Sequence, residues 1–197
     1  MRAPAALTTS ARQAPRARQG GFTLTEVLVT AAVVGLSLSL AVPSLKEAAR
    51  SNLRAAAVNE LVATLHTARS EALTRNRTVA VCPSADGETC SRLPWDAGWI
   101  RFADDNGNFR ADAGEAILGS AVPAGGVEIR TAAFAGAVAF GPAGRVSAPD
   151  LGPTGGDFLF CGTGGDPAPR VIVLSVLGQP QLTGQRLDGR PADCSPG

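Results

Sequence analysis

Residues 18–30 read RQGGFTLTEVLVT, and this stretch places Glu26 at the start of a long apolar segment. Directly after it, residues 27–45 form 19 consecutive positions without a charge. That length meets the requirement of about 20 apolar residues for a helix that crosses a bilayer. A buried core helix is the alternative, but the segment is too long and too uniformly apolar for one. The sequence therefore predicts one transmembrane helix over residues 22–45.

The charges around this segment predict its orientation. Residues 1–21 contain four arginines and no acidic residue, which leaves 14 basic and 17 acidic residues for the rest of the chain. Positive charge stays on the cytoplasmic side of a membrane, so the N-terminus is expected in the cytoplasm and the bulk of the chain outside it. A chain with this balance has no broadly basic surface for nucleic acid, and any such contact has to be local. The four arginines are Arg2, Arg12, Arg16 and Arg18.

A secretory signal peptide is the competing interpretation of the N-terminal segment. It would be cleaved after the apolar run, at small residues. Residues 41–43, AVP, make a poor site because proline follows at once. The junction at residues 20–22, GGF, lies before the apolar run, where an enzyme on the cytoplasmic face can reach it. Cleavage there would remove the arginines and keep the membrane-spanning helix.

Residues 21–26, GFTLTE, followed by an apolar helix, closely resemble the class III leader and N-terminus of type IV pilins and type II secretion pseudopilins. The resemblance implies a leader of residues 1–21 and cleavage between Gly21 and Phe22. It also implies N-methylation of Phe22 and places Glu26 fifth in the mature chain. Pro43 matches a proline that kinks this helix in many pilins, since proline removes one hydrogen bond of the helix.

The carboxylate of Glu26 can also be interpreted from its chemistry. An ionised group inside a membrane is costly unless it is paired, and is a functional candidate for that reason. After cleavage, the nearest cation is the amine of Phe22 in the same or a neighbouring chain, and the resemblance implies the neighbour. The alternative is a glutamate that stays solvated at the level of the lipid headgroups.

After the apolar segment, residues 46–77 contain no glycine or proline and continue the helix. Apolar residues recur there every three or four positions, which predicts an amphipathic helix that packs on a globular head. The members of this stripe are Leu53, Ala57, Leu61, Leu65, Ala68 and Ala72.

Residues 78–197 form the predicted head. Strand-like segments occur at residues 78–82, 98–102, 127–131, 137–140, 157–160 and 170–177, and residues 141–156 are rich in Gly and Pro and indicate a loop. The predicted fold class is α+β: a long N-terminal helix, transmembrane in its first half and amphipathic in its second, packed on a C-terminal antiparallel β domain.

The head narrows the resemblance to the GspH/FimT family of minor pseudopilins and pilins, through residues 68–83, 95–118, 140–145 and 158–161. The resemblance implies a structural subunit near the filament tip that helps to initiate assembly, in a type IV pilus or a type II secretion pseudopilus. Its implied partners are other pilins through the N-terminal helix, the prepilin peptidase and methylase, and the bacterial inner membrane. The head is then periplasmic, and no small-molecule substrate is expected.

The four cysteines allow three pairings. We favour Cys82–Cys90, eight residues apart, together with Cys161–Cys194, which would tie the Gly- and Pro-rich C-terminus to a strand. A zinc site is the alternative. The sequence has no C-x-x-C pair and the compartment is oxidising, so disulfides are predicted and no metal.

One acidic segment resembles a calcium loop. Five residues of it fall at loop positions 1, 3, 5, 9 and 12, but Phe109 stands at position 6, where such loops use glycine. The alternative is a polar hairpin in which the side chains cap their own backbone. The five candidate ligands are Asp104, Asn106, Asn108, Asp112 and Glu115.

DNA binding is the alternative function, since some FimT-type proteins act in natural transformation and carry a Gly-Arg-x-Arg element after the last main strand. The matching residues 178–181 read GQPQ, and glutamine lacks the fixed charge that phosphate binding needs. Arg186 and Arg190 could substitute, although Asp188 and Asp193 accompany them.

An enzyme is not predicted, and neither is a cofactor, because the chain has a single histidine and no nucleophile-elbow or phosphate-loop motif.

Overall fold

The computed structural model of the chain describes residues 21–162 and 169–195. The four arginines of the predicted leader lie outside these residues. The chain divides into two compact units, Met1–Ser44 and Leu45–Gly197. Helix α1 (Leu24–Arg75) has 52 residues; it begins in the first unit and ends in the second.

Helix α1 has a defined end. Asn76 adopts a left-handed conformation with φ 52°, and the Arg77 amide donates to the Ala72 carbonyl at 3.3 Å. The bond spans five residues and starts from the residue after the left-handed Asn76, which is the pattern of a Schellman C-cap; asparagine tolerates the left-handed position better than most residues other than glycine. The helix was expected to run to about residue 77, and it stops at Arg75 because the chain turns there into the first strand.

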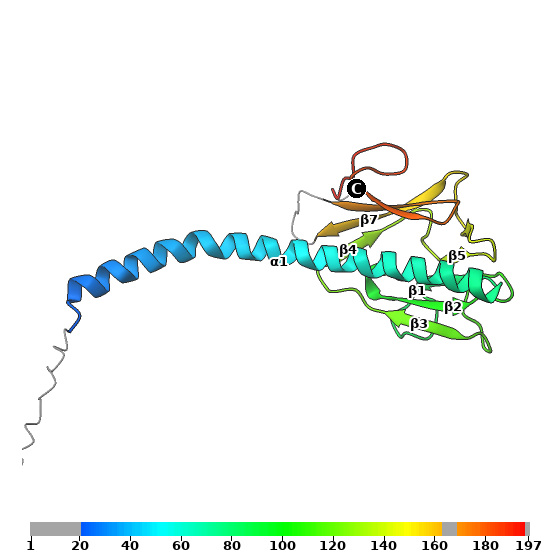
Figure 1. Ribbon diagram of the computed structural model, residues 1–197, viewed down its shortest axis with the longest axis horizontal. Coiled ribbons are helices and arrows are strands. Elements are labelled where there is room, and N and C mark those ends of the chain that lie inside the picture. The colour runs from blue at the N-terminus through cyan, green and yellow to red at the C-terminus, as the bar shows by residue number, and fades with distance from the viewer. Residues whose placement is uncertain (1–20, 163–168, 196–197) are drawn as a thin grey trace, which may run out of the picture. The chain divides into compact units, whose positions relative to one another are not determined.

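The head, which belongs to the second unit, contains two antiparallel sheets (Figure 1). The first has the order β3-β2-β1-β5-β6 and the second the order β4-β7-β8-β9. A long helix with two antiparallel sheets is the α+β arrangement that the sequence predicts, and the prediction is confirmed. The strands of the first sheet are β1 (Val79–Pro83), β2 (Trp99–Ala103), β3 (Ile117–Ala121), β5 (Val138–Phe140) and β6 (Val146–Ser147). Those of the second are β4 (Val127–Arg130), β7 (Gly155–Gly162), β8 (Arg170–Ser175) and β9 (Pro180–Thr183).

Three strands were not predicted. Strand β6 lies inside the segment 141–156 that was predicted to be a loop, and it has only two residues, of which Val146 alone is buried. Strands β3 and β9 are edge strands with largely exposed or half-exposed residues. An edge strand pairs on one side only, so its sequence need not show the apolar alternation that identifies a strand.

The helix and both sheets share one core. All predicted stripe residues from Ala57 to Ala72 are buried in it, but Leu53 is 41 % exposed, although Arg54 beside it is buried, because Leu53 lies on a face of α1 that the head does not cover. Trp99 on β2 donates from Nε1 to the Thr64 hydroxyl on α1 at 3.0 Å. Aromatic rings fill the space between the sheets: Trp95, in the short 3₁₀ helix η1 (Trp95–Ala97), lies edge-on to Phe158, which stacks on Phe134.

Candidate assembly site

The predicted processing and assembly residues lie at the start of α1. Gly21, Phe22 and Thr23 precede the helix, and Phe22 is 83 % exposed. The Thr23 hydroxyl accepts a hydrogen bond from the Glu26 amide at 3.3 Å, while the Thr23 carbonyl accepts from the same amide and from that of Val27. Thr23 is therefore the N-cap, and Glu26 stands three residues later, where a helix dipole favours negative charge.

The first half of α1 exposes apolar side chains. By length and composition the helix can cross a membrane, because an 18-residue window has a mean hydropathy of 2.0 and no part of that window is buried. A globular protein rarely leaves so large an apolar surface uncovered. The large exposed apolar residues of this segment are Phe22, Leu24, Val27, Leu28, Val29, Val33, Val34, Leu36, Leu38, Val42 and Leu45.

Glu26 is the only acidic residue in this part of the helix. Within the described ranges, 21–162 and 169–195, no cation forms an ion pair with it. The amine that we expect to pair with it exists only once the leader has been removed. Pro43 lies within α1, and the kink expected there stays a prediction.

The structure joins the cysteines in the expected pairs, Cys82–Cys90 and Cys161–Cys194. The first disulfide connects the end of β1 to the loop that follows it. The second connects β7 to the C-terminal segment, where Cys161 is buried and Cys194 packs with Ala192 against the cluster around it. Each disulfide thus ties a segment outside the sheets to a strand, β1 in one case and β7 in the other.

The acidic segment forms a hairpin in which side chains cap the backbone. Asp104 is 1 % exposed and accepts hydrogen bonds from the amides of Asn108 at 3.1 Å and Phe109 at 3.2 Å. Glu115 accepts from the amides of Asp105 and Asp112, both at 3.0 Å. Burial raises the pKa of Asp104, although these amides oppose the shift.

The calcium prediction is not supported by this arrangement. Asp112 Oδ2 accepts from the side-chain amides of Asn106 at 2.8 Å and Asn108 at 2.6 Å, so this oxygen already has two partners within the hairpin. Phe109 has a left-handed backbone conformation, with φ 62°, at the position where a calcium loop uses glycine for its sharp turn. In the part of the chain that the structure describes, no three side chains of His, Cys, Asp or Glu gather in a metal-binding group. The geometry fits the alternative interpretation, a polar hairpin in which the side chains cap their own backbone.

The two arginines predicted to contact DNA both lie beside acids. Arg186 binds Asp157 with Nη2 at 3.0 Å from Oδ1, and the Leu187 amide also donates to that carboxylate. The hydrogen bond to Asp157 raises the pKa of Arg186. Arg190 is largely exposed, with Nε 3.5 Å from Asp188 Oδ2. Their charges are balanced locally, and a DNA contact through them stays a prediction.

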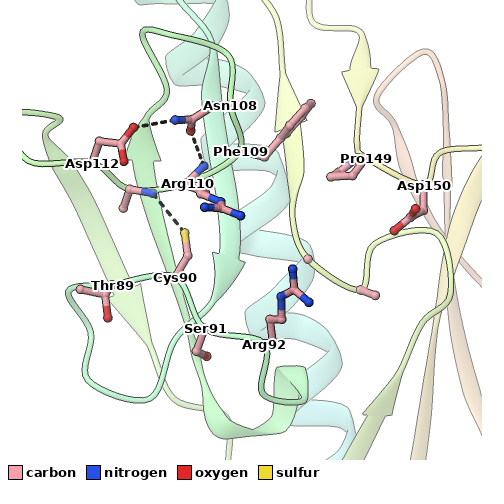
Figure 2. Close-up of a pocket in the computed structure, with 13 residues that line it drawn as sticks. Thr89, Cys90, Ser91, Arg92, Asn108, Phe109, Arg110, Asp112, Pro149 and Asp150 are labelled. Atoms are coloured by element: carbon pink, nitrogen blue, oxygen red, sulfur yellow. Dashed lines mark hydrogen bonds between the residues drawn. The ribbon is translucent and has the colours of Figure 1, made fainter.

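A pocket of about 670 Å³ in the head was not predicted (Figure 2). It lies between the disulfide loop after β1, the acidic hairpin and the segment around Pro149. Figure 2 shows the side chains of Arg92 and Arg110, from two different loops, and that of Asp150 around the same space. The sequence could not indicate it, because residues 92, 110 and 150 meet only through the folding of three separate loops.

Comparison with known proteins shows which families and solved structures the chain resembles. The family model "Type II transport protein GspH" matches residues 57–178, and that of the prokaryotic N-terminal methylation motif matches residues 16–42. No curated protein matches the chain. The type IV minor pilin FimU of Pseudomonas aeruginosa shares 24 % identity, with a TM-score of 0.52 over 68 % of this chain and 90 % of that one. The minor pseudopilin EpsH of the Vibrio cholerae Type 2 Secretion System shares 10 %, with a TM-score of 0.42 over 64 % and 91 %.

The match to FimU agrees with the fold described above. The GspH model covers more than half of the chain, including α1 from Ala57 onward and every strand of the head except β9. The methylation motif covers the start of the helix, where Phe22 and Glu26 lie. The resemblance that the sequence indicated is confirmed: the chain belongs to the GspH family of pilin-like proteins.

Proposed function

We propose that the chain is a minor structural subunit of a type IV pilus or of a type II secretion pseudopilus, held in its filament by α1. The observation that carries the proposal is the exposed apolar first half of α1 with a single carboxylate, Glu26, in its first turn. The family and the methylation motif support it. The proposal assigns the chain no catalytic role.

Processing comes first in this proposal. A prepilin peptidase cleaves between Gly21 and Phe22 on the cytoplasmic face of the inner membrane, and Phe22 is then N-methylated. The single span keeps the head on the periplasmic side, as the arginines before residue 21 favour. The first half of α1 is then available both to lipid and to the helices of other subunits.

Glu26 would act when a subunit leaves the membrane for the filament. In a low-dielectric environment the unpaired carboxylate and the unpaired amine at Phe22 each carry a desolvation cost. An incoming subunit that places its Glu26 beside the amine of a neighbour relieves both costs with one contact. The pairing also fixes the axial register of the two helices, because only one displacement brings the groups together.

The test uses the full-length chain in cells that assemble the filament. Glu26→Val is compared with Glu47→Gln, which removes an exposed carboxylate farther along the same helix. Processing is followed by the mass of the protein and assembly by its amount in sheared filaments. We expect both variants to be inserted and processed, and only Glu26→Val to be absent from filaments. Normal assembly of Glu26→Val would overturn the pairing.

DNA binding remains the second prediction from the sequence, and the ion pairs of Arg186 and Arg190 weigh against it. A mobility-shift assay at low salt with the full-length protein, and with Arg186→Gln and Arg190→Gln in parallel, tests it. Retarded DNA with the unmodified protein, lost in the variants, would revive the prediction.

A further inference from the structure

Asn106 and Gly107, in the acidic hairpin of residues 104–115, form the only Asn–Gly pair of the sequence. Asparagine before glycine loses its side-chain amide readily in water, because glycine has no side chain that would keep its amide nitrogen away from the asparagine Cγ atom. Both residues are exposed, and a Cβ atom on Gly107 would meet nothing within 4 Å beyond its chain neighbours. Water therefore reaches the groups that would react.

In the folded hairpin the Asn106 side chain is held at both ends. Its Oδ1 accepts from the Asn108 amide at 3.1 Å, and its Nδ2 donates to Asp112 Oδ2 at 2.8 Å. The Gly107 amide, whose nitrogen would be the nucleophile, donates to the Asp104 carboxylate. Ring closure bonds Asn106 Cγ to that nitrogen, and the side chain cannot turn to do so while both of its ends are held. The reaction is therefore expected in molecules whose hairpin has opened locally.

The reaction in the opened hairpin exchanges one ammonia for one water. Hydroxide takes the proton of the Gly107 amide, and the nitrogen then bonds to Asn106 Cγ. Nδ2 takes a proton from water and leaves as ammonia, which completes a five-membered succinimide ring. A second water molecule opens the ring, at Cγ to give aspartate or at the main-chain carbonyl carbon to give isoaspartate. Either product replaces a hydrogen-bond donor with an ionised acceptor.

The product cannot restore the hydrogen bonds of the closed hairpin. A carboxylate at position 106 places an oxygen where Nδ2 now donates to Asp112 Oδ2, and two like charges at that separation repel. Asp112 keeps only the bond from Asn108 Nδ2, at 2.6 Å (Figure 2). The other charged groups of this region are mostly acidic and add to the repulsion: Asp104, Asp105, Glu115 and Arg77, which is paired with Asp105.

The hairpin also covers part of the core of the head. Phe109 and Ala111 are half-buried, and the Ala111 amide donates to Cys90 Sγ at 3.3 Å, which joins the hairpin to the disulfide loop. A hairpin that stays open withdraws these two side chains and returns apolar surface to water, which lowers the stability of the head. The cluster against which they pack consists of Ala80, Cys82, Ile100, Phe102, Ala137 and Ala139.

We propose that Asn106 is a site of spontaneous deamidation, and that the reaction converts a transient opening of the acidic hairpin into a permanent one. The inference does not depend on the role of the chain in a filament. Before the reaction the hairpin opens and closes; afterwards the charge at position 106 keeps it from closing. The converted fraction therefore grows with the age of the head.

The experiment incubates the full-length protein in detergent at alkaline pH, beside the same protein unfolded in urea. Trypsin releases the peptide of residues 102–110, FADDNGNFR, which contains the site. Mass spectrometry follows the gain in mass of this peptide, and fragmentation assigns it to position 106 or to Asn108, the internal control. We expect conversion at position 106 alone. The folded protein should react about ten- to a hundred-fold more slowly than the unfolded one, because it reacts only through local opening.

Asn106→Asp tests the lasting effect without the reaction. It should lower the thermal unfolding midpoint by about 2–4 °C, as complete deamidation does, and speed hydrogen exchange at the amides of Phe109 and Ala111. Asn52→Asp, which adds the same charge at an exposed position of α1, should change neither measurement in this way. Exchange rates elsewhere in the sheets show that the head of each variant still folds.

Three results would overturn the inference. Equal rates in the folded and the unfolded protein would show that the reaction does not depend on opening of the hairpin. A folded protein with no conversion after about a hundred half-times of the unfolded one would show that Asn106 is not a site. Fully converted protein with an unchanged midpoint, and unchanged exchange at Phe109 and Ala111, would show that the hairpin closes again.

Discussion

Arg101 Nε on β2 lies 2.9 Å from Glu71 Oε2 on α1, and Arg101 Nη2 also donates to the Leu118 carbonyl at 3.0 Å. The two side chains are only 16 % and 23 % exposed. One guanidinium thus joins the helix to two strands of the first sheet. Removing its partner leaves a poorly solvated cation, which costs more than losing a surface ion pair.

We predict that Glu71→Gln lowers the free energy of unfolding by about 1–2 kcal/mol, between the costs typical of exposed and of fully buried pairs. The control is Asp105→Asn, which breaks the exposed pair with Arg77 and should cost less than about 0.5 kcal/mol. Urea unfolding of the full-length chain in detergent, followed by tryptophan fluorescence, measures both. Equal effects of the two variants would contradict the prediction.

A second prediction concerns the hydrogen bond from Trp99 to Thr64, which is buried between β2 and α1. Trp99→Phe leaves the threonine hydroxyl without this donor, and we expect a loss of about 1–3 kcal/mol. A double-mutant cycle with Thr64→Val isolates the bond, with a coupling energy of about 1 kcal/mol expected from circular-dichroism melts. Strictly additive effects would show that the contact contributes nothing.

The third prediction is a loss of stability in acid that depends on Asp86. Hydrogen bonds from the Thr89 hydroxyl, the amides of Thr89 and Glu88 and the Ser84 hydroxyl lower the pKa of Asp86 below its ordinary value of 3.8. A carboxylate with a lowered pKa in the folded state stabilises the fold above pH 3.8, and that contribution disappears as the pH falls further. Asp86→Asn should therefore be less stable than the unmodified protein at pH 7, and the difference should shrink on acidification. A constant difference from pH 7 to pH 2 would contradict this, as measured by unfolding midpoints across the pH range.

The fourth prediction ranks the two disulfides. Cys161–Cys194 spans 33 residues and Cys82–Cys90 spans 8. By loop-closure entropy, loss of the longer link should cost about 4 kcal/mol and loss of the shorter about 2.5 kcal/mol. Paired Cys→Ala variants of each link, compared by thermal unfolding under the same conditions, test the order. A larger effect from the Cys82–Cys90 pair would show that native packing, rather than chain entropy, sets the ranking.

The fifth prediction concerns calcium and the acidic hairpin. Because Asp104, Asp112 and Glu115 already accept hydrogen bonds from amides, we expect millimolar calcium to leave the unfolding midpoint unchanged. Calorimetric titration of the full-length protein should show no heat beyond dilution. A calcium-dependent rise in the midpoint, abolished by Asp112→Asn, would reverse this interpretation.

The sequence predicted features that arise from local pattern. The stripe from Ala57 to Ala72 has helical spacing, and each of these residues is buried as expected. The cysteine pairs that the sequence favours, a short-range one and one that ties the C-terminal segment to a strand, are those that the structure contains. The long apolar run before residue 46 needs no tertiary information to be recognised as a helix.

The features that the sequence could not supply depend on contacts between distant segments. The spacing of the acids in residues 104–115 is the same whether their oxygens face an ion or the backbone amides of their own hairpin. Strand β3 is recognisable only beside β2, with which it pairs from Trp99↔Ala121 onward. The pocket of Figure 2 lies where the acidic hairpin meets the disulfide loop through the contact of Ala111 with Cys90, and no residue pattern in either segment predicts that contact.

The link between Cys161 and Cys194 has a consequence for the order of synthesis. Its second cysteine follows the first by 33 residues, so the bond cannot form until the chain has been made as far as Cys194. Cys82 and Cys90, by contrast, can pair as soon as the chain has been made as far as residue 90. The later bond therefore links β7 to the segment around Cys194 only in molecules whose chain extends that far.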